Sequence, residues 1–239
     1  MRILFLTQVL PYPLDAGPKV RAYYVLRHLA RHHAVTLVSF VRPTDTPAAV
    51  AHLQAFCCAI HTVPMARSRI KDLAWLGKSL VTAQPFLVAR DWVPAMAHLL
   101  TQLGLADHGF DAIHADQLWM APYALWAGRH ARGASPQLTL DQHNAVYLIP
   151  QRLAQEEANP VKRMLMQLEA CKLARYESAI CRQFDHVMWV TAEDYQAVGE
   201  LDPAAATPLP KTGVIPICVD PAAEPPIQRQ PQARRVTFI

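Results

Sequence analysis

A glycine and two cations stand at the start of a helical pattern, where they could bind an anion. The run PYPLDAGPKVR follows the apolar run RILFLTQ, and the helical spacing begins at Gly17, with Lys19 and Arg21 in the first turn. A helix N-terminus carries partial positive charge and normally favours Asp or Glu. Gly17 can bring a backbone N–H close to a phosphate, and the two cations would balance its charge. The alternative is a plain strand–helix turn with both side chains in water.

A single histidine, His143, follows the apolar run in LTLDQHN. An imidazole titrates near neutral pH, so it can act on a ligand or remain a hydrogen-bonded structural group. Asn144 could bind the same ligand or cap the following helix. Asp141 could orient the imidazole, unless the alternation of side chains along a strand points it away.

Asp116 and His114 lie at the end of another apolar run, FDAIHAD. Asp116 could contact hydroxyl groups of a ligand, or it could be the N-cap of the next helix, which is the interpretation that the pattern favours.

Motifs of several other enzyme classes are missing from the sequence. Without GxGxxG after the first apolar run, a dinucleotide-binding oxidoreductase is not indicated. Without GxSxG, a Ser-His-Asp hydrolase is not supported. There is no HExxH, no D-x-D and no His/Cys cluster with ligand spacing, so the sequence predicts no metal site.

The hydrophobic pattern predicts the elements that must position these residues. Short apolar runs, typical of buried parallel strands, alternate with helical segments. The predicted strands span residues 2–8, 34–41, 59–65, 110–116, 136–144, 185–191 and 212–217, and the helices between them include 66–82, 91–104 and a long region at 146–183. This alternation predicts an α/β fold with a Rossmann-like, doubly wound, mainly parallel sheet. Ligands of such sheets lie beyond the carboxyl ends of the strands, so the residues above should line one rim.

The composition is that of an ordinary globular protein. The chain has 239 residues, 52% hydrophobic and 18% charged, and its net charge of +4 does not indicate nucleic acid as a partner. No apolar run is long enough to span a membrane, and the N-terminus is not typical of a signal peptide. The five cysteines form no CxxC pair, which favours buried free thiols in the reducing cytoplasm.

A basic and aromatic segment, residues 66–90, is a candidate for peripheral contact with the inner face of a membrane. Its cations are interleaved with Trp75, Leu76, Leu80 and Phe86, as in interfacial helices on anionic lipid. The alternative is an amphipathic helix that covers the sheet and turns a basic side to solvent.

The composition changes after Val219. Residues 220–233, DPAAEPPIQRQPQA, are rich in Pro, Gln and Ala and predict a linker. Residues 234–239, RRVTFI, are typical of a new strand. We therefore expect one domain at 1–219, a linker, and the first strand of a second domain.

In this order the motifs resemble the N-terminal domain of family-four glycosyltransferases with the GT-B fold. The resemblance covers essentially the whole chain. It rests on the PYPLDAG turn with the helix–strand unit RAYYVLRHLARHHAVTLVSF, followed by FDAIHAD, LDQHNAV, FDHVMWVTAED and GVIPICVD. Ala16 stands where the family often has a second glycine, and Ile217-Cys218 stands where it commonly has Asn-Gly.

The resemblance implies the N-terminal, acceptor-side half of an enzyme that transfers a sugar from a nucleotide-sugar, with retention and without a metal. The nucleotide-sugar is a co-substrate, and no cofactor is implied. The acceptor would be a sugar or a lipid-linked sugar, in polysaccharide or glycolipid biosynthesis. The chain alone is expected to be inactive, because most donor contacts belong to the other half. A non-catalytic carbohydrate- or phosphate-binding module is the alternative.

The resemblance also implies roles for the rim residues. Gly17, Lys19 and Arg21 would bind the diphosphate of the donor. His143 would be the catalytic residue that holds hydroxyls of the transferred sugar. Asn144 and Asp116 would complete the substrate site.

Overall fold

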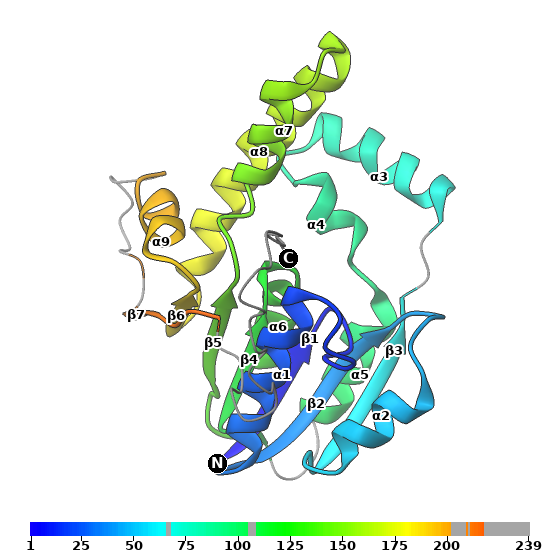
Figure 1. Cartoon of the computed structure of the whole chain (residues 1–239), viewed down its shortest axis with the longest axis vertical. Coiled ribbons are helices and arrows are strands. Elements are labelled where there is room, and N and C mark those ends of the chain that lie inside the picture. Colours follow the sequence, from blue (N-terminus) through cyan, green and yellow to red (C-terminus); the bar gives the residue numbers. More distant parts are fainter. Residues whose placement is uncertain (66–67, 105–108, 202–208, 210, 218–239) are drawn as a thin grey trace, which may run out of the picture.

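The computed structural model describes residues 1–65, 68–104, 109–201, 209 and 211–217. Its centre is a seven-stranded sheet with the strand order β3-β2-β1-β4-β5-β6-β7, in which every neighbouring pair is parallel (Figure 1). The strands are β1 (Arg2–Thr7), β2 (Ala34–Val41), β3 (Ala59–Pro64), β4 (Ala112–Asp116), β5 (Gln137–Gln142), β6 (His186–Trp189) and β7 (Lys211–Val214). The prediction of a Rossmann-like parallel sheet is confirmed. The predicted linker and final strand lie outside the described residues.

Helices cover both faces of the sheet, because the winding direction reverses between β1 and β4. The chain winds from β1 toward β3 and then from β4 toward β7, so right-handed crossovers place the two sets of helices on opposite faces. One face carries α1 (Gly17–Ala30) and α2 (Pro47–Gln54). The remaining helices are α3 (Arg69–Val81), α4 (Phe86–Arg90), α5 (Pro94–Gly104), the 3-10 helix η1 (Leu118–Met120), α6 (Ala121–Arg129), α7 (Leu148–Glu156), α8 (Pro160–Cys181) and α9 (Ala192–Gly199).

Alternate side chains of β1 enter two separate cores. Phe5 packs with Leu26 of α1 in one cluster, and Leu6 packs with Tyr123 of α6 in the other. This alternation is the geometry of a strand that is buried on both faces, and it explains why β1 is apolar without interruption. The reversal between β1 and β4 is the switch point at which such sheets bind ligands, beyond the carboxyl ends of the strands.

The helical region predicted at 146–183 is two helices rather than one. α7 ends at Glu156, and α8 begins at Pro160. The Asn159 side chain accepts hydrogen bonds from the backbone N–H groups of Val161 and Lys162 at 3.0 and 3.2 Å. A proline disfavours helical backbone in the residue before it, and Asn is a strong N-cap, so the helix restarts here.

A short helix that the pattern does not predict, α4, precedes α5. The backbone N–H groups of Phe86 and Leu87 donate to the Glu169 carboxylate of α8 at 3.0 and 2.9 Å. Because its N-terminal cap comes from a distant residue, no local sequence signal marks α4. α7 and α8 extend beyond the carboxyl edge of the sheet, and α3 and α4 lie beside them (Figure 1). Among the described helices, none has the length and apolarity needed to cross a bilayer.

Four of the five cysteines lie in the described part of the chain. Cys57 and Cys181 are buried, whereas Cys58 and Cys171 are exposed. The prediction of buried thiols is therefore right for the first two and wrong for the other two.

Candidate functional site

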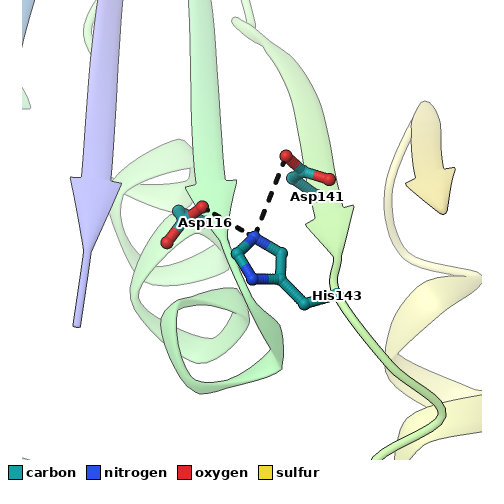
Figure 2. A group of neighbouring side chains, drawn as sticks. All are labelled: Asp116, Asp141 and His143. Atoms are coloured by element: carbon teal, nitrogen blue, oxygen red, sulfur yellow. Dashed lines mark hydrogen bonds and ion pairs between the residues drawn. The ribbon is translucent and has the colours of Figure 1, made fainter. Parts of the chain in front are cut away.

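The carboxyl ends of β4 and β5 bring a histidine and two carboxylates together. Asp116 at the end of β4 lies opposite Asp141 of β5, and His143 follows β5 directly. His143 Nε2 lies 3.0 Å from Asp116 Oδ1 and 4.0 Å from Asp141 Oδ2 (Figure 2). Since a carboxylate only accepts hydrogen bonds, Nε2 carries a proton and donates to Asp116. Asp141 points toward the imidazole rather than away from it.

Arg21 reaches this group from α1 and pairs with Asp141. Its Nε donates to the two carboxylate oxygens at 3.0 and 2.9 Å, and Nη2 donates to Oδ1 at 2.6 Å. Nη1 donates to the Ile215 carbonyl at 2.6 Å. The guanidinium is buried, so the interpretation with this side chain in water is wrong. Because the guanidinium binds the Asp141 carboxylate, Arg21 is not free to bind the diphosphate as the sequence predicted.

The first turn of α1 is open at its N-terminus. Gly17 is exposed, and a Cβ at this position would meet no atom within 4 Å. The N-cap Ala16 offers no side-chain cap, and the first turn holds no acidic residue. Lys19 pairs with the exposed Asp15 at 2.9 Å, a surface contact that water and a ligand can replace. Because Arg21 lies one turn further along α1, its bond to Asp141 places this open turn beside the end of β5.

The carboxylates favour the charged form of the His143 imidazole. Burial alone would lower the pKa of His143, but the negative charge of Asp116, together with its hydrogen bond and the charge of Asp141, outweighs burial and raises the pKa above its ordinary value. An imidazolium donates through both nitrogens. Nε2 is bonded to Asp116, and within the described residues no hydrogen bond occupies Nδ1. This N–H can therefore donate to a bound hydroxyl or phosphate oxygen.

Two helix-capping interpretations are wrong. Asp116 ends β4 with its Oδ1 on His143, and the N-caps of η1 and α6 are Gln117 and Met120, neither with a side-chain cap. Asn144 is exposed, and the N-cap of α7 is Tyr147. Asp116 Oδ2 is buried and has no hydrogen-bond partner within the described chain. A buried carboxylate oxygen without a partner is costly, so this atom is a candidate acceptor for a ligand donor.

The residue after Asp116 has unusual backbone geometry. Gln117 has φ 71 and ψ 159, a region that side chains other than glycine rarely adopt. It is held there by the bond from Gln117 N to the Asp141 carbonyl at 2.9 Å. Strain of this kind is typical of functional sites, where the surrounding structure imposes it.

Replacing Gln117 by glycine is expected to raise the free energy of unfolding by about 1 kcal/mol, because glycine adopts this conformation without steric cost. The matched control is Gln117→Ala, which removes the same side chain but keeps the strain, and it should not stabilise the chain. Urea unfolding of the three proteins measures both effects. Equal stability of the glycine and alanine variants would show that the backbone is not strained here.

Two carboxylates that were not predicted as site residues bind the backbone of residues 145–147, the loop that follows His143. Glu177 of α8 accepts hydrogen bonds from the Val146 and Tyr147 backbone at 2.8 and 3.0 Å, and from the Gln142 side chain. Asp194 accepts from the Ala145 backbone at 2.8 Å. The available signal for Glu177 was a single acid among the buried positions of α8. Asp194 lies in the first turn of α9, where the Thr191 side chain accepts from the Asp194 N–H.

Glu177 should make stability depend on pH. Burial raises its pKa from 4.5 to about 7, despite the three donors. The folded chain therefore holds a proton that the unfolded chain has lost between these values, and stability falls as pH rises through this window. Glu177→Gln cannot ionise at this position. As pH rises from 4.5 to about 7, we therefore expect the unfolding free energy of the native chain to fall by roughly 3 kcal/mol relative to that of the variant. A difference that does not change with pH would contradict this.

His114 lies beneath the cluster and is neutral. It stacks on Phe5 with ring centroids 4.5 Å apart, and its Nδ1 lies 3.0 Å from Thr139 Oγ1. Burial lowers the pKa of His114. The same ring lines a cavity of about 850 Å³ on the α1 face of the sheet, which extends toward Met1 and Gln137. The cavity therefore reaches the amino ends of the strands, and it is also lined by Ile215, whose carbonyl accepts from Arg21 of the cluster.

The cluster places charges of both signs close together. The ligand atoms of Asp116, Asp141 and His143 lie within 4.8 Å of one another, a spacing that could hold a metal ion. The Arg21 guanidinium already holds the Asp141 carboxylate, and Asp116 already contacts His143. The arrangement is suited to an organic ligand that accepts from Nδ1 of His143 and donates to Asp116.

No protein-family model matches the chain, and no curated protein sequence does so either. Solved structures do resemble it. Medicago truncatula UGT71G1, complexed with UDP-glucose, gives a TM-score of 0.56 at 9% identity, over 94% of this chain and 53% of that one. Phytolacca americana UGT2, complexed with UDP-2-fluoro-glucose and pterostilbene, gives 0.52 at 11% identity, over 92% and 55%. Anabaena HepE, in complex with UDP and glucose, gives 0.50 at 14% identity, over 93% and 46%.

These matches show the fold, which is the Rossmann-like α/β fold found in GT-B glycosyltransferases. The chain spans about half the length of each of these proteins.

Proposed function

We propose that this chain is the N-terminal, acceptor-side half of a glycosyltransferase that uses a nucleotide-sugar donor. Residues 1–219 would form this half, 220–233 a linker, and 234–239 the first strand of the donor-binding half. The observation that carries the proposal is the convergence of Arg21, Asp116 and His143 at the carboxyl edge of a sheet. The similar proteins bind UDP, UDP-glucose or a UDP-sugar analogue, and their length leaves room for a second half.

The side chains of the cluster have complementary tasks in sugar transfer. His143 donates Nδ1–H to a hydroxyl of the transferred sugar, and Asp116 holds the imidazole charged and in place. Asp141 and Arg21 act through this pair: Arg21 holds Asp141, and Asp141 faces the imidazole. Two groups remain to bind the sugar acceptor. Asp116 Oδ2 can accept a hydrogen bond from a hydroxyl, and the exposed Asn144 amide can both donate and accept.

The diphosphate of the donor would approach the open first turn of α1. The single backbone N–H of Gly17 lies at an uncapped helix end, where Pro18 supplies no N–H, and Lys19 can exchange Asp15 for phosphate. These groups would stabilise the leaving diphosphate without a bridging metal ion. We further propose that transfer proceeds with retention and that the enzyme belongs to family four. Its acceptor would be a sugar or a lipid-linked sugar in the cytoplasm, in polysaccharide or glycolipid biosynthesis.

A screen of the complete two-domain protein against nucleotide-sugars, with release of the nucleoside diphosphate as the readout, tests this proposal. We expect at least one donor to be turned over, and added EDTA to leave the rate unchanged. Saturable binding of sugars or phosphates without turnover of any donor would favour a non-catalytic binding module instead.

A further inference from the structure

The apolar side of α3 faces the solvent. Ile70, Leu73 and Val81 are 83%, 70% and 84% exposed. Ala74 and Gly77 lie between them and are exposed as well. These residues recur at the three- and four-residue spacing of one helix face, which an ordinary surface helix turns toward the protein. α3 is therefore not the helix with a solvated basic side that the sequence offered as an alternative.

The other side of α3 is fixed on the protein, so the apolar stripe cannot turn inward. Lys172 of α8 donates through Nζ to the Ser79 carbonyl, and Ser79 itself is buried. Leu76 and Leu80 of α3 line a cavity of about 290 Å³ against α8. The Glu169 carboxylate holds the start of α4, five residues after the end of α3. The outward direction of the stripe is thus set by contacts of the segment with α8.

Positive charge is concentrated in the same segment. Residues 66–90 contain five Lys and Arg and a single acid, Asp72, so their net charge equals the +4 of the whole chain. Lys78 lies over the Trp75 ring, with Nζ 4.8 Å from its centroid. An apolar stripe with the exposed Lys78 beside it, in a segment of net positive charge, is complementary to the interface of an anionic bilayer, where acyl chains and phosphates lie at adjacent depths.

We propose that α3 is an interfacial helix through which the chain binds anionic membranes. The stripe of Ile70, Leu73 and Val81 enters the acyl boundary, and the exposed Lys78 contacts lipid phosphates, while the net positive charge of residues 66–90 attracts the chain to the anionic surface. The proposal is independent of sugar transfer, since none of these residues belongs to the cluster at the carboxyl edge of the sheet.

Sedimentation of the chain with vesicles tests the proposal. We expect binding to vesicles that contain phosphatidylglycerol, weak binding to phosphatidylcholine alone, and loss of binding at high salt. Ile70→Gln with Leu73→Gln should weaken the partition roughly tenfold, and so should Lys71→Glu with Lys78→Glu. The control is Val214→Gln on β7, an apolar residue outside α3 that is 47% exposed, and this variant should bind as the native chain does.

Three results would overturn the proposal. The first is equal binding to neutral and anionic vesicles. The second is a lack of vesicle binding together with a concentration-dependent dimer that the Ile70→Gln and Leu73→Gln pair abolishes, since the stripe would then join two copies. The third comes from amide hydrogen exchange of the native chain, which needs no variant: anionic vesicles should slow exchange across residues 69–81, and unchanged exchange there would contradict the proposal.

Discussion

Replacing His143 by alanine in the complete transferase is expected to lower kcat roughly a hundredfold, with a smaller change in KM for the donor. The imidazolium is held by Asp116 with one N–H left to donate, and a contact that strengthens as charge develops on the sugar lowers the barrier more than it tightens binding. Initial rates measured across donor concentrations separate the two parameters.

The control for this variant is His98→Ala. His98 is an exposed histidine of α5 whose Nε2 lies 3.1 Å from Gln102 Nε2, so its loss should leave the kinetics unchanged. If a folded His143→Ala enzyme turned over at the native rate, the imidazole would have only a structural role.

Replacing Arg21 by methionine is expected to lower the free energy of unfolding of the chain by about 3–5 kcal/mol. The guanidinium and the Asp141 carboxylate are both buried and share a two-pronged contact. Methionine fills a similar volume but leaves the carboxylate without its cation, and an uncompensated buried charge is strongly destabilising. Urea unfolding followed by circular dichroism measures the loss.

The double variant Arg21→Met with Asp141→Leu separates the ion pair from packing. Once both charges are gone, no buried ion lacks a partner, so the double variant should be more stable than Arg21→Met alone. A single variant within about 1 kcal/mol of the native chain would mean that the pair is solvated and does not organise the site.

The sheet could be predicted because each buried strand has its own local signature. β2 was predicted with the bounds that the structure gives it, since seven of its eight residues are apolar or β-branched and the strand lies between polar turns. The meeting of Asp116 and His143 followed from a general rule for parallel sheets, whose carboxyl ends lie at one edge. Local pattern and topology together were enough to place these residues at one rim.

The partners of those residues could not be predicted in the same way. Arg21 and Asp141 are 120 residues apart, and no local signal joins them. Asp116 fits an N-cap pattern as well as a rim position, and only the position of the imidazole decides between them. Glu177 is isolated in an apolar helix face, and its three donors come from a loop about thirty residues earlier in the chain. Such contacts depend on packing between elements, which periodicity does not report.

Sugar transfer by the complete two-domain protein, measured beside transfer by residues 1–239 alone, tests the central claim most directly. Positioning two substrates across a cleft supplies a large share of the rate, and this chain would supply only one face of that cleft. The account predicts transfer from a nucleotide-sugar by the complete protein and none by residues 1–239. Transfer by residues 1–239 alone at a rate near that of the complete protein, or no transfer by the complete protein from any donor, would contradict it.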